Sequence, residues 1–107
     1  MANRNLYKLE MLILKVLKDG DCYGYQFAQS IKELSNGRIN IAEGTLYSIL
    51  YKLLEQGFIS DYKELVGKRK SRVYYHLEPA GKEHLLQLMK DYYKMVDAIQ
   101  HILGPRN

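Results

Sequence analysis

Residues 43–77, EGTLYSILYKLLEQGFISDYKELVGKRKSRVYYHL, decide the fold of this chain. Their first part predicts a helix over about Ala42–Gln56, because apolar residues recur there at spacings of three and four. The apolar stripe of this helix consists of Leu46, Ile49, Leu50, Leu53 and Leu54. Two strands are predicted at Phe58–Leu65 and Ser71–Leu77, which are rich in the aromatic and β-branched residues that strands favour. Between them, Val66–Lys70 predicts the turn of a hairpin.

The residues before this stretch predict two further helices. Apolar residues spaced by three and four predict one helix over Leu6–Lys18 and a second over Tyr23–Ser35. The tripeptide Ile39-Asn40-Ile41 alternates apolar and polar side chains, which predicts a very short strand before the third helix.

One long helix is predicted after the hairpin. Pro79 suits the first turn of a helix, where its missing N–H is not needed, and Gly104-Pro105 ends the pattern after Leu103. The order of elements is that of a winged helix-turn-helix protein. The expected fold class is therefore mainly α with a small β-hairpin. We expect residues 1–78 to form a winged helix-turn-helix DNA-binding domain and residues 79–107 to form a long C-terminal dimerisation helix.

The third helix has the surface that a DNA-reading helix needs. In winged helix-turn-helix proteins this helix enters the major groove. Opposite its apolar stripe it presents small or hydrogen-bonding residues near its N-terminus, and a lysine follows one turn later, placed for phosphate. The predicted DNA-contacting residues of this helix are Gly44, Thr45, Tyr47, Ser48 and Lys52.

The hairpin carries a basic cluster. Four basic residues and no acidic residue lie between Val66 and Leu77, in a chain of net charge +4. Taken alone, such a run is equally typical of a solvated loop. Beside a groove-reading helix it predicts phosphate contacts, which supply most of the non-specific affinity for DNA. The predicted DNA-contacting residues of the hairpin are Lys68, Arg69, Lys70 and Arg72.

The last helix predicts a dimer. Its apolar stripe is too long for a domain of this size to cover, and a symmetric pair of copies is the commonest way to cover such a surface. The alternative is that the stripe packs wholly on the first helix of its own chain. Two copies would present two recognition helices, so the expected operator is an inverted repeat in double-stranded DNA. The predicted dimer residues are Leu85, Leu88, Met89, Tyr92, Met95, Val96, Ile99, Ile102 and Leu103.

Several motifs, in order along nearly the whole chain, resemble those of the PadR family of bacterial transcriptional regulators. They are EGTLY at 43–47 with the leucines and GFI that follow it, YGY at 23–25, and RVYYHL at 72–77 followed by Gly81. The resemblance implies a DNA-binding transcriptional regulator, in most cases a repressor, that dimerises through its terminal helix.

The resemblance also implies a small-molecule effector. Short family members sense aromatic or cationic drugs between the two subunits, near the middle of the last helix. Tyr93 and Asp97 are four residues apart and share a helix face, and an aromatic ring beside a carboxylate suits a flat cation. The alternative is that these tyrosines only pack the dimer. The predicted effector-binding residues are Met89, Tyr92, Tyr93, Val96 and Asp97.

Other classes of protein are not favoured. With Cys22 as its only cysteine the chain forms no internal disulfide, which favours the reducing cytoplasm, and it has no apolar run long enough for a membrane. The three histidines are too far apart along the chain to share a metal, and no nucleophile elbow or phosphate-binding loop is present, so we expect no cofactor and no enzyme. The alternative function is a winged-helix module that binds another protein instead of DNA.

Overall fold

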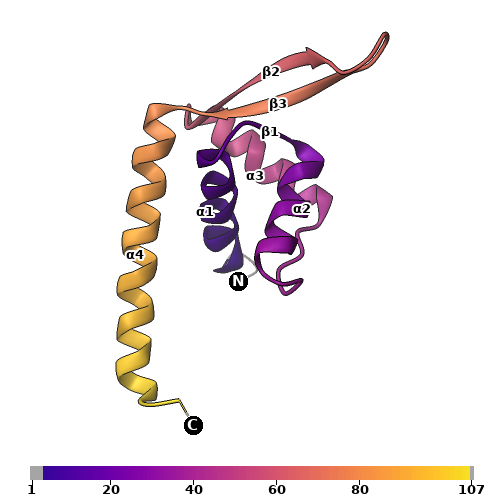
Figure 1. Ribbon diagram of the computed structural model, residues 1–107. Coiled ribbons are helices and arrows are strands. Elements are labelled where there is room, and N and C mark those ends of the chain that lie inside the picture. The colour runs from indigo at the N-terminus through magenta and orange to yellow at the C-terminus, as the bar shows by residue number, and fades with distance from the viewer. Residues whose placement is uncertain (1–3, 107) are drawn as a thin grey trace.

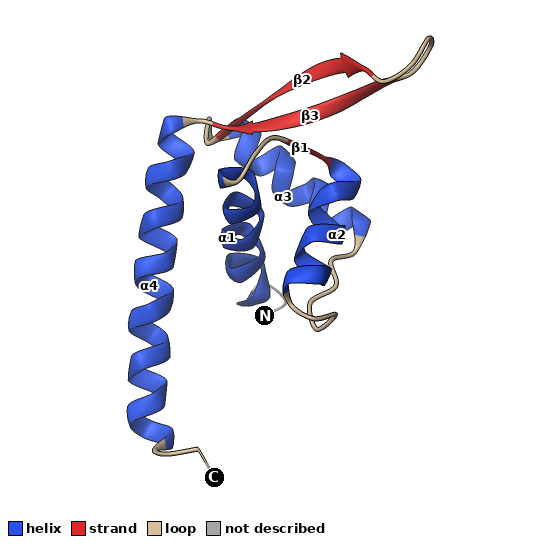
Figure 2. Cartoon of the chain, viewed as in Figure 1, coloured by secondary structure: helices blue, strands red, loops and turns tan. Residues whose placement is uncertain are grey.

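The computed structural model describes residues 4–106, in which three helices pack beneath a small antiparallel sheet and a fourth, longer helix runs beside them (Figures 1 and 2). The elements in chain order are α1 (Arg4–Lys18), β1 (Cys22–Tyr23), α2 (Gly24–Leu34), α3 (Glu43–Glu55), β2 (Ile59–Leu65), β3 (Ser71–Leu77) and α4 (Pro79–Leu103). The predicted fold class, mainly α with a β-hairpin in a winged helix-turn-helix, is confirmed. The predicted domain limits include residues 1–3 and 107, which lie outside the described residues.

The third strand of the sheet lies where the sequence did not predict one. The predicted strand at Ile39-Asn40-Ile41 is wrong, because this segment is a loop between α2 and α3. A strand needs a partner, and the segment that finds one is Cys22–Tyr23, which pairs antiparallel with Tyr75 and Tyr74 of β3. Ile39 and Ile41 are partly buried against the core instead, so their apolar side chains anchor the loop.

The sheet has the order β1-β3-β2, and the β2–β3 hairpin is the wing of the fold. Seven residue pairs join β2 to β3, from Ile59 opposite Leu77 to Leu65 opposite Ser71. The hairpin extends sideways beyond the helices beneath it (Figure 2). Only its base faces the core, where Ile59, Tyr75 and Leu77 are buried.

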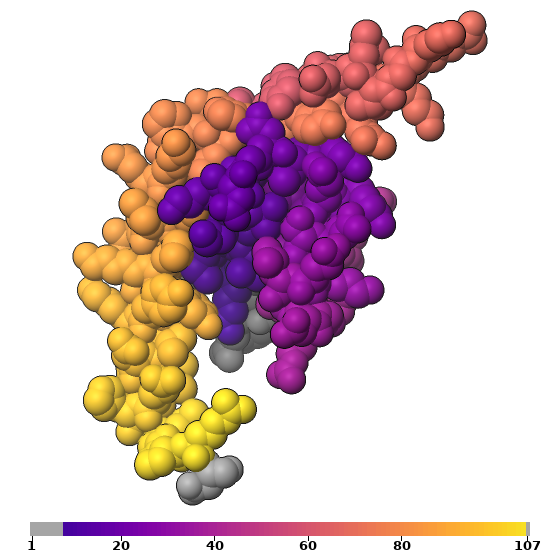
Figure 3. Space-filling model, viewed as in Figure 1, coloured from indigo at the N-terminus to yellow at the C-terminus, as the bar shows by residue number. Residues whose placement is uncertain are grey.

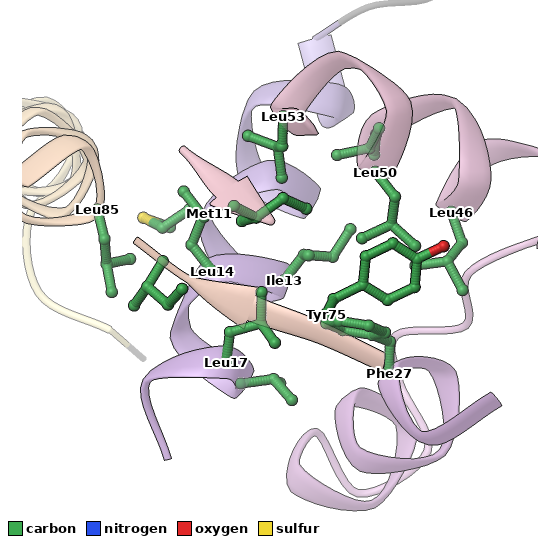
Figure 4. Packing of buried hydrophobic residues seen from close by; sticks show 14 of the residues in the cluster. Met11, Ile13, Leu14, Leu17, Phe27, Leu46, Leu50, Leu53, Tyr75 and Leu85 are labelled. Atoms are coloured by element: carbon green, nitrogen blue, oxygen red, sulfur yellow. The ribbon is translucent and has the colours of Figure 1, made fainter. Parts of the chain in front are cut away.

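The core lies between the three short helices, the base of the wing and the first half of α4 (Figure 4). Its largest fully buried side chains are Phe27, Ile13, Leu14, Leu50, Leu53 and Leu85. Phe27 of α2 meets Tyr75 of β3 edge to face, with ring centroids 5.9 Å apart. The apolar stripe predicted for α3 therefore does face inward, and the opposite side of that helix faces solvent.

The long helix α4 is divided into a packed half and a free half. Gly81 allows its first turn to approach the chain closely, because a Cβ there would meet the carbonyl oxygen of Phe58 and lie 2.7 Å from Cδ1 of Leu77. Leu85 and Leu88 are 1% and 5% exposed within a single chain. Further along, the helix extends past the body of the molecule (Figure 3). Within residues 4–106, no helix combines the length and apolar character of a membrane span.

Candidate nucleic-acid interface

The outward face of α3 (Glu43–Glu55) is polar and accessible. Gly44, Ser48 and Lys52 are exposed, and Thr45 is half-buried at the edge of the face. Apart from its chain neighbours and the backbone of its own helix, no heavy atom of the described residues lies within 4 Å of the position that a Cβ would take at Gly44, so a DNA backbone or base edge can approach the helix closely there. The structure therefore brings these four predicted residues onto one surface.

Tyr47, the fifth predicted residue of α3, has a packing role that the sequence did not reveal. Its ring lies against Gly24, the first residue of α2, and it is half-buried. The ring of Tyr51 lies one turn further on, with centroids 6.4 Å apart, and its side chain is 65% exposed. Tyr51 thus joins the accessible face, and its position opposite the apolar stripe is the sequence signal from which it could have been predicted.

The tip of the wing, Val66–Lys70, is a compact basic turn. The Val66 N–H donates to the Lys70 carbonyl oxygen at 2.9 Å and closes the turn. Lys68, Arg69 and Lys70 are exposed there, at the end of the hairpin that lies farthest from the helices (Figure 1). Such a projecting cationic turn is suited to the phosphates that flank a groove.

Arg72 differs from the other basic residues of the wing. Its guanidinium lies over the ring of Tyr23 of β1, 4.2 Å from the ring centroid, in a cation–π contact. It therefore packs on the outer face of the sheet, the face turned away from the core, and does not extend from the tip. Its predicted DNA contact remains a prediction, and the structure gives it a second role in joining β3 to β1.

The outer face of the sheet is lined by one tyrosine from each strand. The ring centroids of Tyr23 and Tyr74 are 5.6 Å apart in an edge-to-face arrangement, and those of Tyr74 and Tyr62 are 5.7 Å apart and stacked. Cross-strand aromatic pairs of this kind stabilise a sheet. The register explains the row, because Tyr74 lies opposite both Tyr23 and Tyr62.

A carboxylate that the sequence analysis missed lies next to this row. Tyr62 donates its hydroxyl hydrogen to Oδ2 of Asp21 at 2.7 Å, and Nδ1 of His76 lies 2.8 Å from Oδ1 of Asp21. Because a carboxylate can only accept, His76 donates its Nδ1–H. The bonds from His76 and then from Tyr62 hold the pKa of Asp21 below its ordinary value. The bond to Asp21 in turn raises the pKa of Tyr62 to about 12.

Two other groups have a raised pKa because they are buried. For Cys22 burial is the main cause, and the charges of Asp21 and Asp19 add to it. For Tyr75 burial is again the main cause. Both side chains therefore stay neutral near pH 7 and add no charge to this surface.

The joint between α1 and α4 contains the third polar contact of note. Nε2 of His84 lies 3.0 Å from Oε1 of Glu10, and the His84 ring stacks on Phe58 with centroids 4.2 Å apart. This contact fixes the first half of α4 against α1. Among residues 4–106, the histidines, cysteine and carboxylates form no group of three or more arranged to hold a metal.

The predicted effector residues are only partly brought together. A cleft of about 260 Å³ between α1 and α4 is lined by Met89, Tyr92 and Tyr93, whereas Val96 and Asp97 do not line it. The rings of Tyr92 and Tyr93 meet edge to face at 5.5 Å. From the other side, Lys8, Met11, Leu12, Lys15 and Ile39 complete the lining. The cleft thus contains two lysines instead of the expected carboxylate.

The predicted dimer residues divide in the same way as α4. Leu85 and Leu88 are buried in the core of their own chain, which leaves little of either side chain for a partner, and their place in a dimer surface stays a prediction. Met89 and Tyr92 are partly buried against that core, and Val96 is half-buried. The remaining four, Met95, Ile99, Ile102 and Leu103, are 61%, 44%, 83% and 75% exposed.

Comparison with known proteins agrees with this geometry. The model of a family described as the transcriptional regulator PadR-like family matches residues 13–87. An uncharacterized protein of Lysinibacillus sphaericus is 31% identical over 91 residues, which span 85% of this chain and 84% of that protein. A transcriptional regulator from Clostridium thermocellum has a similar structure, with a TM-score of 0.83, 28% identity and coverage of 90% of both chains.

A further similar structure contains DNA. It is PadR of Bacillus subtilis in complex with operator DNA, with a TM-score of 0.70 and 27% identity. The match covers 77% of this chain and 46% of the Bacillus subtilis chain. The part shared with that protein therefore has the same arrangement of elements as a structure solved on DNA.

Proposed function

This chain belongs to the PadR-like family of transcriptional regulators, and from that premise we propose that it binds an operator as a homodimeric repressor in the cytoplasm. The observation that supports DNA binding best is the pairing of two surfaces in one chain. The polar, open face of α3 carries Gly44, Ser48 and Lys52, and the projecting wing tip carries exposed cationic side chains. In this fold a recognition helix contacts bases and a basic wing contacts phosphates. The two surfaces therefore suit the base contacts and the phosphate contacts of one DNA interface.

The proposed dimer is supported by the free half of α4. Met95, Ile99, Ile102 and Leu103 are exposed apolar residues on a helix that extends past the body. A second copy of the same half-helix offers the same apolar side chains, and a two-fold pair covers both. Such a pair presents two α3 helices and two wings, so the proposed operator is an inverted repeat.

The α1–α4 cleft supports an effector that is aromatic rather than cationic. Tyr92, Tyr93 and Met89 supply ring and thioether contacts for a flat molecule. Lys8 and Lys15 lie in the same lining and repel a cation. The cleft lies between the helix of the DNA-binding domain and the proposed dimer helix, so a molecule bound there shifts operator affinity if it fits one arrangement of the two helices better.

The effector proposal is tested with matched ligands. Planar aromatic compounds of equal size, one set anionic and one cationic, are added to the purified protein and thermal shift is measured. We expect shifts with the anionic set that Tyr93→Ala removes. Hits only among the cations, or hits that survive Tyr93→Ala, would contradict the assignment of this cleft.

The operator proposal is tested by selecting fragments of the source genome on the purified protein. Fluorescence anisotropy on the recovered site then gives affinity over a salt series, and sedimentation gives the number of chains bound. We expect an inverted repeat, two chains for each site, and an affinity that falls steeply with salt. Recovery of no preferred sequence would contradict the proposal and favour a module that binds another protein.

A further inference from the structure

The wing is attached to the rest of the fold by few contacts. β1 and β3 share only two residue pairs, and the core-facing side of the hairpin is buried only at its base. On that side Val73 is already partly exposed, and Leu65 is 74% exposed. The basic tip lies beyond both residues, so a small rotation at the base moves the tip a long way (Figure 1).

Asp21 lies at that base and contacts both strands of the wing. It belongs to the connection between α1 and β1, and its two carboxylate oxygens accept from different strands. Oδ2 accepts from Tyr62 of β2 at 2.7 Å, and Oδ1 accepts from His76 of β3 at 2.8 Å. Hydrogen bonds to a charged acceptor are about twice as strong as neutral ones. One side chain therefore joins both strands of the hairpin to the helical body.

The aromatic row on the outer face extends this attachment across the sheet. Tyr62 stacks on Tyr74, Tyr74 meets Tyr23, and Arg72 covers Tyr23. The tyrosine that donates to Asp21 is thus also the last ring of the row. The hydroxyl bond and the ring contacts favour the same position of β2 and β3 relative to β1.

We propose that Asp21, Tyr62 and His76 form a wing latch, a set of positioning residues that fixes the angle between the wing and α3 so that both reach one stretch of DNA. The proposal rests on the DNA-binding function proposed above and adds Asp21 and Tyr62, which no motif marked, to His76 of the RVYYHL stretch. None of the three needs to touch DNA. Their effect is to hold Lys68, Arg69 and Lys70 where phosphates lie when α3 is in the groove.

The sign of the mutational effect separates the latch from simple electrostatics. Asp21 is a negative charge in a protein whose proposed partner is a polyanion, so its removal alone should strengthen binding. The latch predicts the opposite. Asp21→Asn should weaken binding to the operator severalfold, whereas Asp61→Asn, an exposed aspartate of β2 with the same change of charge, should leave it unchanged or tighter.

The salt dependence identifies which contacts are lost. Each phosphate contact contributes about 0.9 to the slope of log affinity against log salt. Asp21→Asn should lower the magnitude of this slope by about 1–2 for each subunit. The reason is that the wing then loses about one to two contacts with DNA phosphates. In a chain that already has alanine at positions 68, 69 and 70, Asp21→Asn should cause no further loss. Additive losses would overturn the proposal.

A measurement without DNA tests the latch independently of the operator. Residual dipolar couplings of the amides of residues 63–73, compared with those of α2 and α3, report the orientation of the wing in the free protein. We expect them to change in Asp21→Asn and, to a smaller extent, in Tyr62→Phe, which keeps the ring stack and loses one hydrogen bond. Should Asp21→Asn fail to fold, Tyr62→Phe is used instead, both in the DNA-binding measurements and in the dipolar-coupling measurement.

The outcomes are distinguishable. If the wild-type protein binds no DNA but the couplings change, the latch stands and the proposed function fails. If the wild-type protein binds and Asp21→Asn matches Asp61→Asn in affinity and salt slope, the function stands and the latch is overturned. Unchanged couplings in both latch variants would overturn the latch in either case.

Discussion

The ring of Tyr47 occupies the space above Gly24, and its Cζ atom lies 2.9 Å from where a Cβ at Gly24 would be. The contact joins the first residue of α2 to the exposed face of α3, the two helices of the helix-turn-helix. Only a glycine lets them approach this closely. The angle between the two helices, and with it the presentation of α3, therefore depends on the absence of a single methyl group.

The first prediction concerns this contact. Gly24→Ala forces the Tyr47 ring aside, and we expect a loss of about 1–2 kcal/mol in the free energy of unfolding, together with weaker operator binding. The loss is moderate because the ring lies at the movable end of its side chain. Urea denaturation and anisotropy measure the two effects. In a Tyr47→Ala background, Gly24→Ala should cost less than about 0.5 kcal/mol, because the ring that the new methyl group would meet is absent.

Gly44→Ala is the matched control, because no described residue beyond its chain neighbours and its own helix backbone comes within 4 Å of its Cβ position. We expect its stability to be equal to or up to about 1 kcal/mol above that of the wild type, as alanine favours helix. Its operator binding should nevertheless fall, because the methyl group projects from the face that approaches DNA. A variant that binds normally would remove this turn of α3 from the interface.

The second prediction concerns the wing tip. Lys68→Glu/Arg69→Glu should abolish most operator binding, because two phosphate attractions become repulsions. Lys32→Glu/Arg38→Glu makes the same change of charge at exposed positions on α2 and in the loop that follows it, and should weaken binding far less. Anisotropy at two salt concentrations compares them. Equal losses in both variants would mean that only the net charge of the protein matters.

The third prediction separates the two halves of α4. Ile99→Glu places a charge on the exposed apolar face and should give a folded monomer by sedimentation, with Gln100→Glu as a neighbour that keeps the dimer. Leu85→Ala should instead lower the free energy of unfolding by about 2–5 kcal/mol, because it leaves a cavity in the core of one chain. A dimer that survives Ile99→Glu would place the interface elsewhere.

The fourth prediction is a pH dependence. The hydrogen bond to Asp21 raises the pKa of the Tyr62 phenol from 10.0 to about 12, so folding favours its neutral form. This contribution to stability is complete below pH 10 and disappears as the pH rises through 12. Denaturation between pH 9 and 12 should show a steeper loss for the wild type than for Tyr62→Phe. Superimposable profiles would show that the bond is not formed in solution.

Much of this architecture follows from the sequence, and the exceptions have physical causes. The helix over Glu43–Glu55 and the hairpin were predictable because their signals are local: a period of three to four residues, and then β-formers around a basic turn. β1 was not predictable, because two residues are too few to show the alternation of a strand and its partner strand lies far along the chain. Ile39 and Ile41 alternate like a strand but only bury their side chains against the core.

In the candidate site, too, the residues with a local sequence signal were predictable and those that depend on long-range contacts were not. The exposed residues of α3 and the wing tip follow from helix projection and charge. Asp21 has no local signal, because its partners lie 41 and 55 residues away. The stripe of α4 is continuous in sequence, yet Leu88 is buried and Ile99 is exposed, since burial depends on how far α1 extends beside it. Length and periodicity define the stripe but not what covers each part.

The division of α4 also bears on how the regulator responds to its own abundance. Because Leu85 and Leu88 complete the core within one chain, folding does not wait for a second copy, and a stable single subunit can exist at low concentration. Assembly of the proposed dimer through the free half would then be a separate equilibrium. Below its dissociation constant the amount of dimer rises with the square of the number of subunits. Occupancy of the proposed operator would thus change more sharply with expression level than it would for a protein that folds only as a pair.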